Sequence, residues 1–115
     1  MKKSVVQEKS YIFAIQVVRT YRHVILTQKE FVLTRQFLRS GTSIGANIYE
    51  GEQAQSRPDF ISKMSIALKE AHETGYWINI LHDTEYLPDD RYHLLDTQLM
   101  ELVKLLTAII KTSRK

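Results

Sequence analysis

The sequence of 115 residues contains no cysteine, which excludes disulfide bonds and metal sites built from thiolates. It has four glycines and two prolines, so few positions can interrupt a helix. No apolar run approaches the roughly 20 residues of a membrane-spanning helix. Gln7, Glu8 and Lys9 interrupt the apolar stretch that a signal peptide would need. These absences lead us to expect a cytoplasmic protein that does not bind membranes.

The motifs of common catalytic classes are missing as well. The sequence has no Gly-x-Ser-x-Gly nucleophile motif and no phosphate-binding loop. A di-metal helical bundle needs two Glu-x-x-His pairs, whereas the nearest match here is a single Asp90-x-x-His93 pair. We therefore expect no enzymatic activity, no cofactor and no metal.

Length and composition indicate one domain over residues 1–115, with 43% hydrophobic and 25% charged residues, as is typical of a globular protein. The net charge of +3 is unevenly distributed. Residues 1–57 carry nine Lys or Arg against four Asp or Glu, and residues 58–115 carry seven against nine. The basic half could attract phosphate, or the two halves could be solvated faces that help neighbours to dock.

Periodic apolar residues and the breaks between them predict four helices, over residues 8–26, 29–50, 57–84 and 89–112. Short connections between helices of this length are typical of antiparallel neighbours. The sequence therefore predicts an all-α, up-down-up-down four-helix bundle.

Local signals mark several helix ends. Thr27 with Glu30, and Ser56 with Asp59, have the spacing of a capping box at a helix start. Gly51 is placed to end the second helix, because glycine adopts the left-handed conformation at little cost.

The first and last predicted helices differ in how their apolar residues are arranged. In the first, one apolar face consists of Tyr11, Ile15, Val18 and Ile25, with Ala14, Val17, Tyr21 and Val24 beside it. The last has a seam in steps of three and four from Tyr92 to Ile109, and further apolar residues outside the seam. The residues outside it are Leu94, Val103, Leu105 and Ile110. A helix that is apolar on two faces needs two partners, of which one is the core and the other could be another subunit.

The second predicted helix contains a cluster of small residues between residues 40 and 47. Gly41 and Gly45 share a helix face, although each costs about 1 kcal/mol against alanine in a helix. The third helix has small residues at the same spacing, at Ala67, Ala71 and Gly75. We therefore predict that the second and third helices approach closely at these residues.

Two motifs lie within these helices. Residues 38–51 have the pattern LR…SI..NI.EG, and residues 59–77 have the pattern DF..K..IALKEA.ET.YW. Together they resemble the 23S rRNA-intervening sequence protein family, also called the four helix bundle protein family, over about residues 11–106. Many members have a Gly-Ser pair where this chain has Lys69 and Glu70. The residues that we expect to set packing within the motifs are Gly41, Ser43, Ile44, Gly45, Asn47, Glu50, Gly51, Ala67, Lys69, Glu70, Ala71 and Glu73.

The resemblance mainly implies an architecture. Members resemble left-handed four-helix bundles that assemble into ring-shaped homopentamers. A similar fold serves as the accessory protein of diversity-generating retroelements, in which a basic pentameric barrel engages nucleic acid and a reverse transcriptase. The family is named after insertions within rRNA genes that encode some members, and no catalytic residues are established for it.

Four charged motif residues, Glu50, Lys69, Glu70 and Glu73, are spaced so that they could interact. They could form a polar site between subunits, or a half-buried ion-pair network that fixes the register of the helices. We place Trp77 at a subunit interface or its edge, where tryptophan is enriched.

Arginines are the best candidates for a binding role. Arg19 and Arg22 share a face of the first helix, and Arg35 and Arg39 share a face of the second. Ring symmetry would multiply their field, and each phosphate contact adds salt-dependent affinity. These arginines could instead be plain surface charge, or pair with the acidic residues 83–90 of a neighbour.

We therefore predict a non-enzymatic homo-oligomer, as a pentamer if the resemblance holds, that binds RNA or DNA through these arginines as an accessory or scaffold protein. The alternative is a scaffold for a protein client without nucleic-acid binding. A third hypothesis, a bundle that binds a ligand or metal, is disfavoured by the missing ligand spacing.

Overall fold

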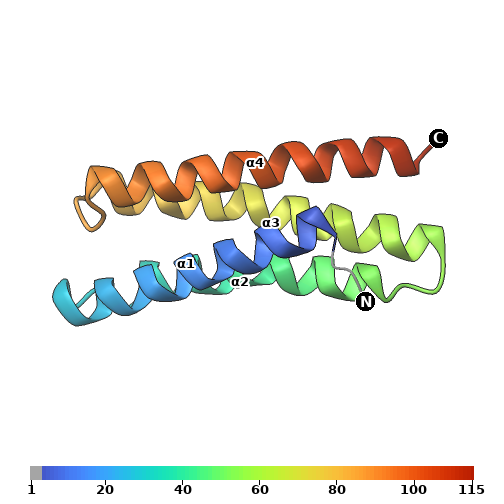
Figure 1. Cartoon of the computed structure of the whole chain (residues 1–115). Coiled ribbons are helices and arrows are strands. Elements are labelled where there is room, and N and C mark those ends of the chain that lie inside the picture. Colours follow the sequence, from blue (N-terminus) through green and yellow to red (C-terminus); the bar gives the residue numbers. More distant parts are fainter. Residues whose placement is uncertain (1–3) are drawn as a thin grey trace.

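The computed structural model describes residues 4–115 as four antiparallel α-helices in one elongated bundle, 45 Å along its longest axis (Figure 1). The helices are α1 (Val5–Thr27), α2 (Leu33–Glu52), α3 (Arg57–Asp83) and α4 (Asp89–Ser113). Each helix packs against the next one along the chain, and α4 closes the arrangement against α1. The predicted all-α, up-down-up-down four-helix bundle is confirmed.

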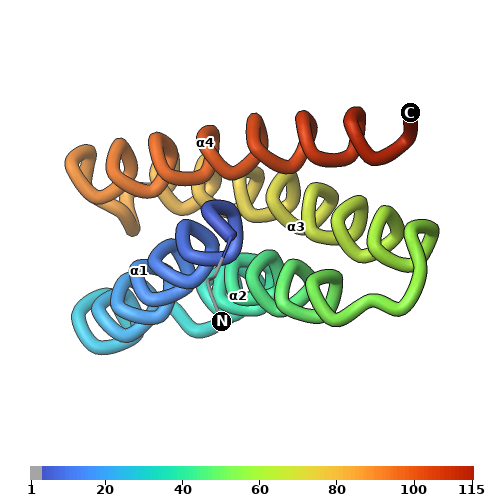
Figure 2. Tube along the Cα trace, turned by 45° about the vertical axis from the view of Figure 1, so that its right-hand side comes forward, coloured from blue at the N-terminus to red at the C-terminus, as the bar shows by residue number. Residues whose placement is uncertain are grey.

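The two ends of the bundle differ in what they contain. The connections α1–α2 and α3–α4 lie together at one end, which we call the hairpin end (Figure 1). The α2–α3 connection and the C-terminus lie at the opposite end, which we call the terminal end. Figure 2 shows α1 and α2 as one hairpin and α3 and α4 as the other. The predicted basic and acidic halves of the sequence therefore correspond approximately to two hairpins.

One of the two predicted helix caps is present in the structure. The Ser56 hydroxyl accepts a hydrogen bond from the Asp59 amide at 3.2 Å, which confirms the cap of α3. The predicted cap at Thr27 is wrong, because this residue is the last of α1 and its hydroxyl donates to a carbonyl of that helix. The Glu30 carboxylate instead accepts from the Thr34 amide at 2.7 Å and so caps α2.

The core lies between the inner faces of all four helices. Its largest fully buried side chains are Phe13, Val17, Val24, Phe37, Ile44, Ile48, Met64, Ile78, Leu81, Leu95, Leu102 and Leu106. Burying one such side chain contributes about 1.5–3 kcal/mol relative to leaving it exposed. Ala67 and Ala71 are also fully buried, as expected for small residues on the inner face of α3.

The glycines of α2 approach a different helix from the one predicted. A Cβ atom on Gly41 would lie 2.8 Å from both γ-carbons of Val17 in α1, and one on Gly45 would lie 3.4 Å from atoms of Ser10. The prediction that these glycines meet the small residues of α3 is therefore wrong. Helical spacing determines which residues share a face, but it does not determine which neighbouring helix that face meets.

Gly51 does not end α2 by the predicted left-handed turn. It lies inside the helix, and its φ angle is not positive. It is buried, and a Cβ atom there would lie 2.7 Å from Cε of Met64 and 3.2 Å from Cβ of Lys63 in α3. Close approach between α2 and α3 therefore occurs at Gly51, near the terminal end.

Candidate assembly and nucleic-acid surface

Helix α1 buries one apolar stripe and exposes a second one. Phe13, Val17 and Val24 are fully buried, whereas most side chains of the predicted apolar face point outward. On that outer face Tyr11 is 61% exposed, Val18 39% and Ile15 36%. Because α1 is apolar on more than one side, its periodicity alone does not decide which stripe enters the core. The outward stripe therefore leaves apolar surface exposed on one copy of the protein.

The outward stripe continues into a groove between α1 and α2. The groove has a volume of about 290 Å³ and is lined by Gln7, Ser10, Tyr11, Ala14, Thr42, Gly45, Ala46 and Tyr49. A second hollow follows α1 and is lined by Tyr11, Ala14, Ile15, Val18, Arg19 and Arg22. The two hollows share Tyr11 and Ala14, so they form one continuous surface. We call the apolar residues Tyr11, Ala14, Ile15, Val18, Ala46 and Tyr49 the α1–α2 surface.

Two predicted arginines border this surface. Arg19 and Arg22 line its end nearer the hairpin end, and both are exposed. Arg35 is exposed in the first turn of α2, close to the same end. None of the three forms an ion pair with another residue between 4 and 115. They are therefore available to anions in one copy of the protein.

Arg39 lies in a different environment from the other predicted arginines. Its guanidinium donates to Glu70 at 3.3 Å and also forms an ion pair with Glu73, both on α3. The Trp77 indole N–H donates to Glu73 at 3.2 Å. This bond, with Arg39 beside it, holds the pKa of the Glu73 carboxyl below its usual range. The structure therefore joins Arg39, Glu70, Glu73 and Trp77 into one network, which we call the α2–α3 network.

The remaining charged residues of the motifs lie outside this network or at its edge. Glu50 pairs with Lys63 at 3.0 Å near the terminal end, so it does not join Glu70 and Glu73. Lys69 is exposed and acts on Glu73 through its charge. Trp77 is half-buried against the core, and its ring meets that of exposed Tyr76 edge-on at 5.1 Å.

The polar residues of the second-helix motif bond within α2. Asn47 donates to the Ser43 carbonyl at 2.8 Å, and the Ser43 hydroxyl donates to the Arg39 carbonyl at 2.6 Å. Asn47 thus satisfies a backbone group. Ile44 between them is fully buried. These bonds satisfy polar groups within α2 rather than offering free groups to a ligand.

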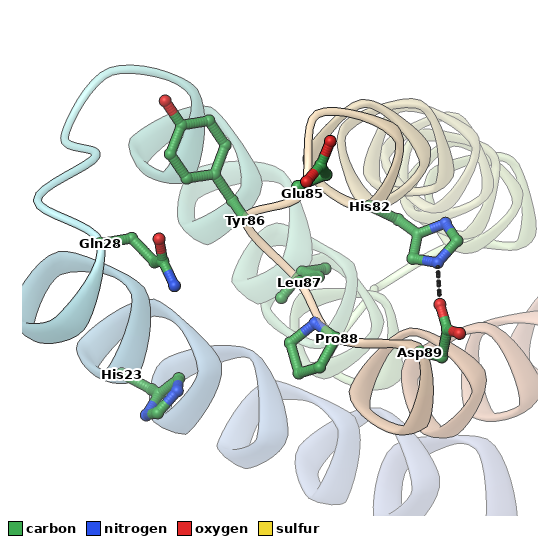
Figure 3. Close-up of a pocket in the computed structure, with 8 residues that line it drawn as sticks. All are labelled: His23, Gln28, His82, Glu85, Tyr86, Leu87, Pro88 and Asp89. Carbon is green, nitrogen blue, oxygen red and sulfur yellow. Dashed lines mark hydrogen bonds and ion pairs between the residues drawn. The ribbon is translucent and has the colours of Figure 1, made fainter.

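Sequence reasoning missed a polar cluster at the hairpin end (Figure 3). A hollow there is lined by His23, Gln28, His82, Glu85, Tyr86, Leu87, Pro88 and Asp89. His82 Nε2 lies 2.6 Å from Asp89 Oδ1, and the imidazole stacks on the Tyr92 ring with centroids 4.1 Å apart. The hydrogen bond to Asp89 raises the pKa of His82. The spacing of seven between His82 and Asp89 gives no helical signal, because a turn separates them.

Two further properties bear on function. Within residues 4–115, no group of three or more His, Asp or Glu side chains is arranged to hold a metal ion. None of the described helices is both long enough and apolar enough to cross a membrane.

Comparisons with known proteins identify relatives of this chain. The family model of the 23S rRNA-intervening sequence protein matches residues 2–108. A crystallised protein of unknown function from the S23 ribosomal protein family of Bacteroides thetaiotaomicron VPI-5482 is similar, with 54% identity and a TM-score of 0.91. The match covers 93% of this chain and 99% of that one. No curated protein matches.

Proposed function

The chain belongs to the 23S rRNA-intervening sequence protein family, and we propose that it is a non-enzymatic, homo-oligomeric scaffold that binds nucleic acid through basic residues. The α1–α2 surface supports this proposal, since it is apolar and exposed, and borders two arginines without an ion-pair partner among residues 4–115. Contiguous exposed apolar surface on a small protein marks an interaction site. Self-association would cover it and bring arginines of several copies together.

The number of subunits follows from the family resemblance, which implies a pentamer. Five copies would place five sets of Arg19, Arg22 and Arg35 on one assembly. Each neutralised phosphate steepens the salt dependence of binding, so a patch that is weak in one copy becomes strong in a ring. RNA and DNA both carry this phosphate backbone, and we propose no preference between them.

The native mass of the purified protein, measured with the ratio of absorbance at 260 and 280 nm, tests the proposal. We expect an oligomer that retains nucleic acid at low salt and releases it at high salt. A monomer at every concentration would contradict the assembly. An oligomer that binds no RNA or DNA of any length at low salt would contradict the nucleic-acid role.

Arginine substitutions locate the binding residues. Arg19→Gln with Arg22→Gln should weaken binding and lower the slope of log affinity against log salt by about one for each phosphate that is no longer neutralised. Arg57→Gln with Lys69→Gln removes the same charge from α3 and serves as the matched control, which should bind as the wild type does. Arg39 is unsuitable for this test, because its substitution would also break the α2–α3 network.

A protein scaffold without nucleic acid is the second candidate, and one arrangement favours it. The turn between α3 and α4 is acidic, with Glu85 in the turn, Asp83 at the end of α3 and Asp90 at the start of α4, and it lies at the same end of the bundle as Arg19 and Arg22. In an assembly these arginines could therefore pair with carboxylates of a neighbour. In that case the oligomer would be free of nucleic acid, and the arginine double variant would lower its stability.

A further inference from the structure

The turn between α1 and α2, residues 28–32, exposes two large apolar side chains at the hairpin end (Figure 1). We call this segment the α1–α2 turn. Phe31 is 52% exposed and Val32 is 72% exposed. Neither residue lines the groove or the hollows described above. Packing among residues 4–115 therefore gives no reason for an aromatic ring at this position.

Local features fix the backbone of the α1–α2 turn. Lys29 adopts the left-handed conformation, with a φ angle of 56°, which is uncommon for a residue with a side chain. The Glu30 carboxylate accepts hydrogen bonds from the Val32 amide at 3.1 Å and from the Thr34 amide at 2.7 Å. These features hold the chain on both sides of Phe31, so a ligand at the ring would have little backbone to order.

The charges next to Phe31 are positive and unpaired. Lys29 precedes the ring by two residues, and Arg35 follows it by four, about one helical turn. Both are exposed, and neither forms an ion pair with another residue between 4 and 115. The acidic residue between them, Glu30, bonds to two backbone amides. The α1–α2 turn therefore combines a flat apolar ring with unpaired positive charge.

Phe31 differs from the other exposed aromatic residues. Among residues 4–115, the Phe, Tyr and Trp side chains that are more than half exposed are Tyr11, Phe31, Tyr49 and Tyr76. Tyr11 and Tyr49 belong to the α1–α2 surface, which self-association would cover. Tyr76 meets Trp77 edge-on, and Trp77 belongs to the α2–α3 network with its two carboxylates. Phe31 is therefore the exposed ring that lies near unpaired cations and outside the α1–α2 surface.

Resting on the proposed binding of nucleic acid, we infer that the nucleic acid is single-stranded and that Phe31 stacks on one of its unpaired bases. Every base has an apolar face, so an exposed aromatic ring adds affinity for a single strand without reading its sequence. Lys29 and Arg35 contact the phosphates on either side of that base. In a duplex the bases already stack on one another, so Phe31 adds no affinity there unless a base pair opens.

A protein partner fits these residues less well. Lysine is depleted at protein interfaces, whereas it is a common phosphate ligand. Residues 22–35 expose Arg22, Lys29 and Arg35 and no carboxylate. A polyanion gains more from such a segment than does a protein surface, which carries both signs of charge.

The acidic turn between α3 and α4 limits where the strand can lie. Gln28 lines a hollow that also contains Glu85 and Asp89, and Phe31 does not line it (Figure 3). Both carboxylates would repel phosphate. The strand should therefore pass the α1–α2 turn on the side of Lys29 and Arg35 without entering the hollow.

Truncation of the ring tests the stacking. Fluorescence anisotropy would give the dissociation constants of a labelled oligothymidylate of about 12 nucleotides and of a duplex of the same length. We expect the wild type to bind the single strand more tightly than the duplex. Phe31→Ala should weaken binding of the single strand about 5- to 100-fold, the effect of one stacked base, and leave duplex binding unchanged.

Two further variants control for other effects of this substitution. Phe31→Tyr keeps an aromatic ring and should bind the single strand as the wild type does. Tyr76→Ala removes a ring that is 59% exposed on α3, and this matched control should leave binding unchanged. Circular dichroism would verify that each variant is folded.

Salt dependence separates stacking from charge. Phe31→Ala should leave the slope of log affinity against log salt unchanged, because no phosphate contact is lost. Arg35→Gln should lower that slope by about 0.7, the value for one phosphate of a single strand. An abasic strand of the same length has phosphates without bases, so Phe31→Ala and the wild type should bind it equally.

The outcomes distinguish this inference from the proposed function. Unchanged binding of the single strand by Phe31→Ala, or an equal loss on strand and duplex, would overturn the stacking and leave the proposed function intact. Tighter binding of the duplex by the wild type would overturn the preference for single strands. A wild-type protein that binds neither probe at low salt would instead contradict the proposed function itself.

Discussion

The two sides of helix α2 satisfy their side chains in different ways. Toward α3, Arg39 is paired with two carboxylates and Glu50 with Lys63. Toward α1, an apolar surface lies open beside Arg22, which has no ion-pair partner within residues 4–115. The polar groups on the α3 side are thus paired within one copy, whereas the α1 side leaves apolar surface exposed.

This difference shows which contacts the residues of the two sequence motifs make. Ser43, Asn47, Glu70 and Glu73 all belong to the motifs, and all are engaged in bonds that position α2 against α3 or stabilise α2 itself. The α1–α2 surface draws mainly on α1, outside the motif region. The family resemblance therefore predicts the bundle well and says less about the exposed α1–α2 surface.

The largest expected effect comes from the glycines that bring α1 and α2 together. Gly41→Ala should destabilise the protein by about 1–3 kcal/mol, because the new methyl group would overlap both γ-carbons of Val17 at 2.8 Å. Gly45→Ala should be neutral or stabilise by up to about 1 kcal/mol, because its nearest contacts are at 3.4 Å and alanine favours the helix.

Denaturant unfolding of the two variants would measure this contrast. Equal destabilisation by both would mean that the α1–α2 contact is uniformly tight. Equal stabilisation by both would mean that Val17 moves freely. Either result would show that the contact between Gly41 and Val17 does not limit side-chain size more than the contact at Gly45 does.

The next effect compares a paired arginine with an unpaired one. Arg39→Gln should lower the free energy of unfolding by up to about 1 kcal/mol, a value limited by solvent screening because its side chain is 48% exposed. Arg22→Gln should leave the unfolding free energy within about 0.5 kcal/mol of the wild type, as is usual for a surface substitution. Thermal and denaturant unfolding in monomeric conditions would measure both.

A double-mutant cycle sharpens the same comparison. Arg39→Gln and Trp77→Phe both act on Glu73, so their effects should not add. Arg22→Gln combined with Trp77→Phe should be additive. Additivity in the first pair would show that the α2–α3 network does not act as a unit.

The sequence was sufficient for the elements of the fold and insufficient for their mutual orientation. Caps such as Ser56 and the turn prolines are local signals, so the helix bounds agree within a few residues. The outward direction of Tyr11 and the contact between Gly41 and Val17 depend on which apolar stripe of α1 is buried in the core. That choice follows from the packing of all four helices together, and no single helix contains it.

The smallest expected effect is a pH dependence at the hairpin end. His82 has its pKa raised by the hydrogen bond to Asp89, and Asp89 has its pKa lowered by the same bond. The contribution of His82 to the free energy of unfolding is fully present below its unfolded pKa of about 6.5. It is lost as pH rises through the higher pKa of the folded state. The contribution of Asp89 to the free energy of unfolding is present above its unfolded pKa of about 3.9. It is lost as pH falls through the lower pKa of the folded state.

The melting temperature of His82→Gln compared with that of the wild type, measured from pH 4 to pH 9, would isolate this bond. We expect the wild type to melt higher in acidic buffer and the two curves to converge as pH rises past the raised pKa of His82. His72→Gln, at an exposed position on α3, is the matched control and should follow the wild type throughout. A constant difference between His82→Gln and the wild type at every pH would mean that stacking on Tyr92, rather than the charge, holds α3 to α4.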